Sequence, residues 1–292
     1  MSISVGIGLA FVAMLCWGIG DFLIQKSTRK VGDFETLFLI TFFGALILAP
    51  FVYRDIPMLF VAGNETELAV LLGGALILFV AALLNFEALR KGKISVVEPI
   101  WSLEIVTASV FAFAILGEKL SSRETVLVVL LMVGLILVSF RGKVFSHRHF
   151  LERGVWLAFL GALCMGIANF FVGWGARLTD ALMVNFVFNV VLAFLSGIYL
   201  FRHGRISRAF RDLWRYRVSM MPMLVTDNAA WVAYAFSMSL ISIGIATALS
   251  ESYIIIAVLL GLAVNKERLE RHQKIGLVVA VIAAITLAAL TT

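Results

Sequence analysis

Six acidic residues fall inside long apolar stretches of this sequence, and no lysine or arginine lies comparably deep. The six are Asp21, Glu87, Glu98, Glu104, Asp227 and Glu251. An ionised side chain in hydrocarbon costs at least about 2.5 kcal/mol unless it faces a cavity, water or a partner. Ion pairs inside these stretches cannot neutralise all six, which leaves protonation, polar neighbours, water or a cationic ligand. The residue types therefore predict a site that attracts protons or cations.

Two of these acids have aromatic neighbours one helical turn away. Trp17 precedes Asp21 by four residues and Trp231 follows Asp227 by four, so each pair shares a helix face. Tyr234 extends the second face. An acid beside aromatic rings favours an amine or another cation. The alternatives are an inter-helix hydrogen bond for Asp21 and ordinary core packing for the aromatic stripe.

The acid Glu98 is followed directly by a proline. Pro99 removes a backbone donor, so a helix through this segment is predicted to kink beside the carboxylate, as a gate would require. The alternative is that Glu98 lies at the solvated end of the helix. Trp101, three residues later, either lines the same cavity or packs in the core.

The composition determines which elements must hold these residues. The chain of 292 residues is 62% hydrophobic and only 14% charged, whereas soluble domains are nearer half apolar and a quarter charged. About 20 apolar residues cross a bilayer as a helix. Ten segments of this kind are predicted to be transmembrane helices: 3–25, 34–53, 67–89, 94–116, 124–140, 154–175, 181–201, 218–238, 243–264 and 273–290.

The sequence contains an internal repeat. Residues 9–22 match 157–170 without a gap, with Leu, Ala, Phe, Cys, Gly and Ile in register. A second match pairs residues 117–120 with 266–269, where each stretch carries Glu, a basic residue and Leu in the same order. The two halves of the chain are therefore predicted to be copies of one five-helix unit.

The predicted units are residues 1–145 and 150–292. Because each has an odd number of helices, the second must enter the membrane from the opposite side, which is an inverted repeat with its substrate site between the halves. Asn169 falls opposite Asp21. Ungapped alignment places Glu251 opposite Ser102, about half a turn from Glu104, so the two carboxylates are expected to face one cavity and to favour sharing a proton.

Basic residues are distributed unequally between the two sides of the predicted helices. Twenty of the 24 lysines and arginines fall in the segments after the first, third, fifth, seventh and ninth helices. The other four are Arg54, Lys119, Arg123 and Arg177. The positive-inside rule therefore predicts a multi-pass cell-membrane protein with both termini outside the cytoplasm. Segment 203–217, with arginines between apolar residues at helical spacing, is either an amphipathic surface helix or a basic loop.

Three motifs resemble the drug/metabolite transporter superfamily, and its EamA-type branch in particular. They are Cys16-Trp17-Gly18, the passage from Arg90 to Glu98-Pro99, and Leu116-Gly117-Glu118-Lys119-Leu120. The resemblance implies ten helices around a central cavity, alternating access, and export or exchange of small metabolites or drugs. The second half departs from the pattern, with Met165 in place of Trp and Ala248 in place of Pro.

The leading hypothesis is a secondary active transporter of a small cationic or zwitterionic metabolite or drug, coupled to protons or working by exchange. The alternative is a flippase-like carrier of a lipid-linked or larger amphipathic substrate. A membrane enzyme is disfavoured because no nucleophile or metal motif is evident. The expected partners are a small-molecule substrate, protons and the lipid bilayer, without nucleic acid, metal or cofactor, in a monomer or homodimer.

Overall fold

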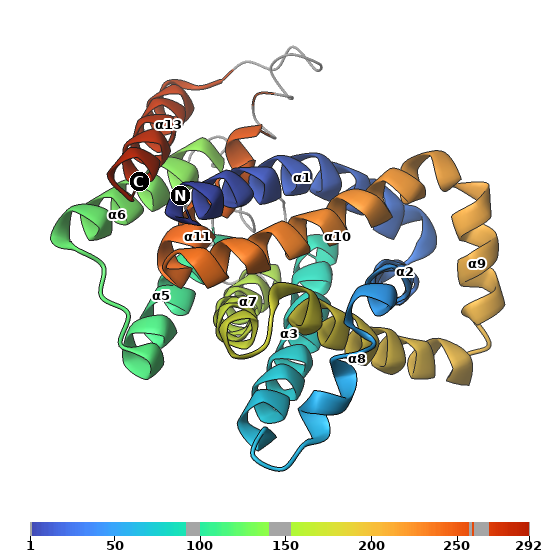
Figure 1. Cartoon of the computed structure of the whole chain (residues 1–292). Coiled ribbons are helices and arrows are strands. Elements are labelled where there is room, and N and C mark those ends of the chain that lie inside the picture. The colour runs from blue at the N-terminus through green and yellow to red at the C-terminus, as the bar shows by residue number, and fades with distance from the viewer. Residues whose placement is uncertain (1, 92–99, 140–152, 257–258, 260–268, 292) are drawn as a thin grey trace.

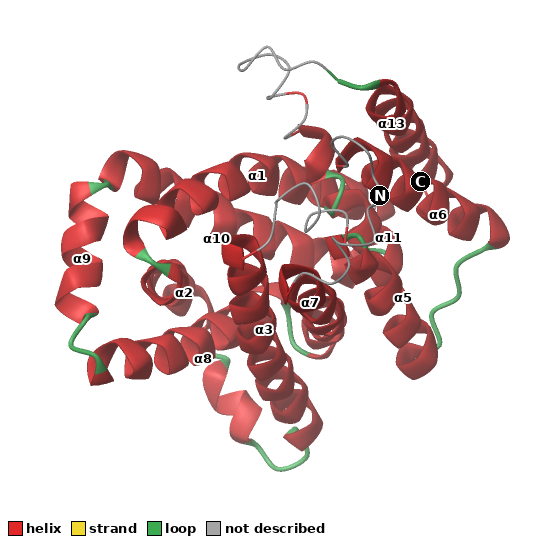
Figure 2. Cartoon of the chain, turned by 180° about the vertical axis from the view of Figure 1, so that it is seen from behind, coloured by secondary structure: helices red, strands yellow, loops and turns green. Residues whose placement is uncertain are grey.

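The computed structural model describes residues 2–91, 100–139, 153–256, 259 and 269–291. These residues form eleven α-helices and one short 3₁₀ helix, and they include no strand (Figures 1 and 2). The α-helices are α1 (Ser2–Val31), α2 (Asp33–Val52), α3 (Glu65–Lys91), α5 (Leu103–Leu116), α6 (Ser122–Ser139), α7 (Arg153–Leu178), α8 (Ala181–Arg202), α9 (Ile206–Arg215), α10 (Arg217–Leu240), α11 (Ile243–Ser250) and α13 (Arg271–Thr291), and the 3₁₀ helix is η1 (Ile56–Phe60).

Seven of the described helices are long and apolar enough to cross a membrane. They are α1, α2, α3, α6, α7, α8 and α13. Two shorter apolar segments, α5 and the stretch Ile243–Ile256 that begins with α11, come from the predicted fourth and ninth spans. The all-helical, multi-pass architecture is thus confirmed, whereas the total of ten spans stays a prediction.

The first helix of each half of the chain packs mainly against helices of the other half. The first helix of the first half, α1, packs along α10, and the first helix of the second half, α7, packs along α3 (Figure 1). In the same way α5 packs against α7, and α11 packs against α1. The remaining extensive pairs join α2 to α8 and α6 to α13. Each first helix is therefore buried mainly by the other half.

Two glycines allow two of these helix pairs to approach closely. A Cβ atom at Gly166 in α7 would lie 2.5 Å from Cβ of Thr107 and 2.8 Å from the Glu104 carbonyl oxygen. A Cβ atom at Gly18 in α1 would lie 2.8 Å from Cβ of Ile256 and 3.4 Å from a carbonyl oxygen of the same neighbouring helix. Small residues are what permit such close helix packing.

The predicted spans 94–116 and 243–264 each contain a break in regular helix among the described residues, while the kink predicted beside Glu98 lies outside them. Helix α11 ends at Ser250, and beyond it the amide of Ser252 donates to the Leu249 carbonyl at 3.2 Å, a contact with the third preceding residue. The Ala248 carbonyl, which would accept from the Ser252 amide in a regular helix, accepts from the Ser252 hydroxyl at 3.0 Å. Helix α5 likewise begins only after Ser102, whose carbonyl accepts from Ile105 at 3.3 Å.

Candidate functional site

Three aromatic side chains predicted for the site lie in contact. The ring of Trp17 from α1 meets Trp231 and Tyr234 of α10 edge-on, with centroids 5.2 Å and 5.0 Å apart. Trp17 is 7% exposed and Tyr234 is fully buried, while Trp231 keeps part of its surface free. The close α1–α10 pair thus brings together rings that lie more than half the chain apart in sequence.

The phenol of Tyr234 is held in place by α11. Its hydroxyl lies 2.8 Å from Oγ1 of Thr247, and that threonine hydroxyl donates to the Ile243 carbonyl at 2.7 Å. Because a hydroxyl has a single proton to donate, Tyr234 must be the donor to Thr247. The oxygen of Tyr234 therefore remains available as an acceptor.

Two acidic residues, one from each half, converge on this tyrosine. Glu104 at the start of α5 is 5% exposed, and Glu251 directly after α11 is 7% exposed. Both carboxylates interact electrostatically with the Tyr234 hydroxyl. Each acid lies close to the point where its helix departs from regular geometry, Glu104 just after Ser102 and Glu251 just after Ser250.

Asn169 links one of these acids to the second half. Its side-chain amide donates to the Glu104 carboxylate at 3.4 Å, and the asparagine is 2% exposed. Removal of such a buried amide would leave the carboxylate with one donor fewer.

The remaining predicted acids are placed less completely. Asp227 in α10 is 7% exposed, and within the described ranges no hydrogen bond or ion pair is found at its carboxylate. Gly20 of α1 packs beside Thr226 and the Asp227 amide, so the backbone of Asp21 lies next to α10. The Asp21 side chain and all of Glu98 lie outside the described residues.

Trp101 lies apart from the other aromatic residues of the predicted site. It packs with Ile100 and Leu157 around the buried Ala88 and Ala158. Its indole Nε1 is buried, and no acceptor for it is found in the described part of the chain. Trp101 therefore contributes to the α3–α7 contact and not to the group around Tyr234.

Asparagines of α8 and α10 form a separate polar junction. Asn189 donates to the Asn228 side chain at 3.1 Å, and Asn228 donates to the Ile40 carbonyl of α2 at 3.1 Å. Asn185 donates to the Trp231 carbonyl at 3.3 Å. These side-chain amides hold α2, α8 and α10 together by polar contacts between helices.

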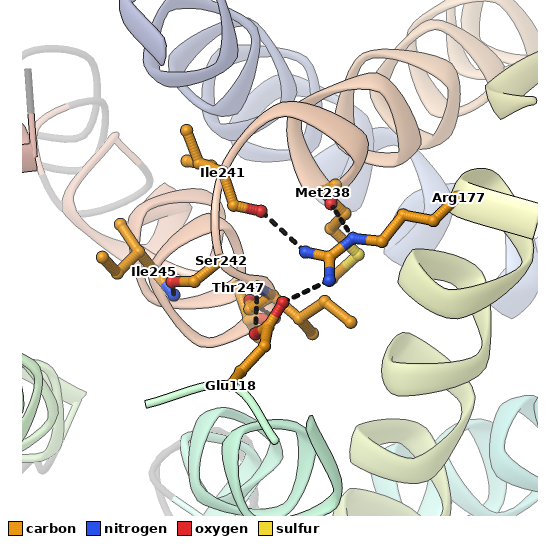
Figure 3. A network of polar contacts seen from close by, with 8 residues as sticks. Glu118, Arg177, Met238, Ile241, Ser242, Ile245 and Thr247 are labelled. Atoms are coloured by element: carbon orange, nitrogen blue, oxygen red, sulfur yellow. Dashed lines mark hydrogen bonds and ion pairs between the residues drawn. The ribbon is translucent and has the colours of Figure 1, made fainter. Parts of the chain in front are cut away.

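Sequence reasoning missed a polar network at the helix ends (Figure 3). Arg177 at the end of α7 forms an ion pair with Glu118, and it also donates to the carbonyl oxygens of Met238 and Ile241 at 2.9 Å each. Glu118 in turn accepts from the Ile243 amide at 2.9 Å, at the start of α11. The network joins the α5–α6 connection of the first half to three helix ends of the second.

The glycine before Glu118 explains how that side chain reaches the network. Gly117 has a φ of 68° and ends α5 in the left-handed region, where a Cβ atom is disfavoured. A cavity of about 430 Å³ opens beside the network, lined in part by Lys119 and Ser239. It lies at the helix ends and not at Tyr234, whose surrounding acids are almost fully enclosed.

Metal binding receives no support from the described side chains. Among them, no group of three or more histidines, cysteines or acids could hold a metal ion. The site is therefore described by carboxylates, a phenol, an amide and indole rings alone.

Comparison with known proteins gives one family and one fold. The family model described as "EamA-like transporter family" matches residues 4–140 and again residues 152–289. No curated protein matches the sequence. Among solved structures, 29 chains match. One crystal structure, described only as that of a protein, aligns with a TM-score of 0.74 at 16% identity, over 98% of this chain and 97% of that one. At this identity the likeness shows the fold alone.

Proposed function

The chain belongs to the EamA-like transporter family, and we propose that it carries a small cationic or zwitterionic molecule across the membrane by alternating access. One observation carries the proposed substrate class. Glu104 and Glu251, from opposite halves, are both buried and both interact with the Tyr234 hydroxyl. Two buried carboxylates beside a phenol make an acidic environment that suits a positively charged ligand or protons.

The aromatic rings define the kind of cation that the site would accept. Trp17 and Trp231 offer apolar, electron-rich surfaces beside the acids, which suits an amine attached to an apolar or aromatic body. A zwitterion would find a donor for its anionic group in the side-chain amide of Asn169, which has two N–H groups. Organic phosphates are disfavoured because no deep basic residue would meet them.

The proposed mechanism uses the repeat. Gly18 and Gly166 occupy matching positions and pack against matching atoms, and Ser102 matches Glu251 at the two interruptions. These correspondences support ten spans in two inverted five-helix units. Interrupted helices at equivalent positions of two repeats are typical of transporter binding sites, where they permit bending. Movement there would open the enclosed acids to one side at a time.

The Glu118–Arg177 pair is proposed to close one end of the path. It joins the two halves where α7 and α10 end and α11 begins. By the positive-inside rule this end, like both termini, faces away from the cytoplasm, and α9 lies at the cytoplasmic end. Opening to the outside would require the arginine to leave Glu118 or the two carbonyls.

Uptake into proteoliposomes tests the proposed function. The purified protein is reconstituted, a panel of aromatic and aliphatic amines and amino acids is offered with and without a pH gradient, and Glu104→Gln and Glu251→Gln are compared with wild type. We expect saturable uptake of a cationic or zwitterionic compound, reduced at least about tenfold in each variant, as for removal of one charged contact of 1.4 kcal/mol or more.

The matched control is Glu65→Gln, an exposed acid at the start of α3. It should transport like wild type. Equal activity of all three variants would contradict the assigned site, and indifference to the gradient would exclude proton coupling. If lipid-linked sugars raise the unfolding temperature of the purified protein and amines do not, the flippase-like alternative would be favoured.

A further inference from the structure

Helix α9 presents two different faces. Ala209 and Leu213 are buried against a cluster that includes Phe38 and Leu39 of α2, so this face anchors the helix to the bundle. Its outer edge carries Phe210 and Trp214, which are 37% and 68% exposed. In Figure 1 the helix lies at the margin of the molecule, between the ends of α8 and α10. A large aromatic ring left exposed at such a margin is typical of a side chain at the membrane interface.

Arginines border the exposed aromatic edge. Arg211 lies three residues before Trp214, on the same side of the helix, and Arg215 directly follows it. Arg217 lies 5.3 Å from the Trp214 ring centroid and donates to the Trp214 carbonyl at 3.3 Å. All three arginines are exposed. Among the described residues, none of them has an acidic partner within ion-pair distance. The patch made by these three arginines and Trp214 therefore has unbalanced positive charge.

Two neighbouring arginines show the contrast. Arg205 pairs at 2.7 Å with Glu35, which is buried at the start of α2, and Arg208 pairs at 3.4 Å with Asp212. Their charges are balanced within the protein, and the first pair ties the beginning of α9 to α2. The patch is thus the part of this basic segment whose positive charge is available to a negatively charged ligand from outside the protein.

The surface next to the patch continues into an apolar band. Along α10, Val218 is 87%, Met221 is 40% and Val225 is 61% exposed. Phe201 at the end of α8 is 76% exposed. In a bilayer this band would face acyl chains, so the arginines just beyond it would lie at the depth of the lipid phosphates.

We propose that the patch of Arg211, Arg215, Arg217 and Trp214 is a binding site for the headgroup of an anionic phospholipid. The guanidinium groups bind the phosphate, the Trp214 ring lies at the acyl–headgroup boundary, and the apolar band of α10 packs along the chains. The predicted cytoplasmic position of α9 agrees with this, because the cytoplasmic leaflet carries the anionic lipids. The Arg205–Glu35 ion pair fixes the beginning of the same helix to α2.

Thermal unfolding in detergent micelles tests the site. Wild type is titrated with phosphatidylglycerol, with phosphatidylcholine, and with inorganic phosphate as the soluble source of the same chemistry. We expect phosphatidylglycerol to raise the unfolding midpoint by several degrees and the other two to have little effect. In the Arg211→Gln/Arg215→Gln/Arg217→Gln variant the affinity for phosphatidylglycerol should fall about fivefold per arginine removed.

The matched control removes three charges from elsewhere on the surface. Arg54, Lys119 and Arg123 are exposed, and replacing all three by Gln should leave the lipid effect as in wild type. The lysine variant of the patch, which keeps the charge, should retain most of the effect and shows that the region still folds. An undiminished lipid effect in the glutamine variant, or an equal loss in the control, would overturn the proposal, as would an equal effect of inorganic phosphate.

Discussion

The crossing of α5 on α7 and the crossing of segment Ile243–Ile256, which begins with α11, on α1 are built alike but carry different chemistry. In each, a glycine of the first helix of one half approaches a carbonyl oxygen and a Cβ atom of the fourth helix of the other half. The residues at matching positions differ: Glu104 and Asn169 in one crossing correspond to Tyr253 and Asp21 in the other. Backbone packing therefore follows the repeat while the polar groups do not, and the proposed site is asymmetric.

The largest expected effect comes from breaking the crossings themselves. Gly166→Val should destabilise the protein by about 3 kcal/mol, because its Cβ would collide with Thr107 and with a backbone carbonyl that cannot rotate away. Gly18→Val should cost less, since the corresponding carbonyl is 3.4 Å away. The measurement is the free energy of unfolding in mixed micelles titrated with denaturing detergent.

Gly8 provides the control for this prediction. It lies in α1 like Gly18, but a Cβ atom there would meet nothing within 4 Å. Gly8→Val should change stability by less than about 1 kcal/mol, within the range of helix propensities. A similar loss at all three glycines would mean that the close crossings are not what makes Gly18 and Gly166 necessary.

An intermediate effect is expected from the polar pair found in only one crossing. Asn169→Leu should destabilise by about 2 kcal/mol, because buried Glu104 loses an amide donor. The Glu104→Leu/Asn169→Leu double variant should recover most of that loss, since replacing both partners by apolar groups can be nearly neutral. A strictly additive double variant would argue against the 3.4 Å contact as an energetic link.

The smallest effect is expected from the polar contact of the other crossing. Ser250 donates to the Ala10 carbonyl at 3.4 Å, and both residues are buried. Because this contact involves two neutral groups at long distance, Ser250→Ala should cost only about 0.5 kcal/mol in the same unfolding assay. A loss as large as that of Asn169→Leu would remove the proposed difference between the crossings.

Local sequence patterns predicted the helices, whereas a cavity shared by Glu104 and Glu251 stays a prediction. Runs of apolar residues determine helix positions because lipid demands internally bonded backbone, and the repeat gives the register in which the halves meet. The same register brings Trp17 to α10. The family resemblance drawn from the motifs around Trp17, Pro99 and Glu118 is confirmed by the family match across both halves.

Long-range side-chain partners could not be predicted in this way. Arg177 was counted only as an orientation signal. In the structure it pairs with Glu118 and donates to the carbonyl oxygens of Met238 in α10 and of Ile241, which follows that helix. The interruption after α11, where the Ser252 amide donates to the Leu249 carbonyl, also leaves no mark in the hydropathy of the sequence. Glu118 beside Lys119 in sequence gave no indication that its partner would come from the other half.

The exchange of first helices has a consequence for biosynthesis. During translation α1 enters the membrane long before α10, its main packing partner, has been made. Until then Trp17 lacks its aromatic neighbours, and α3 likewise lacks its main packing partner until α7 has been made. The two halves should therefore assemble together only after α10 has been synthesised, and the first half completes its packing on the helices of the second.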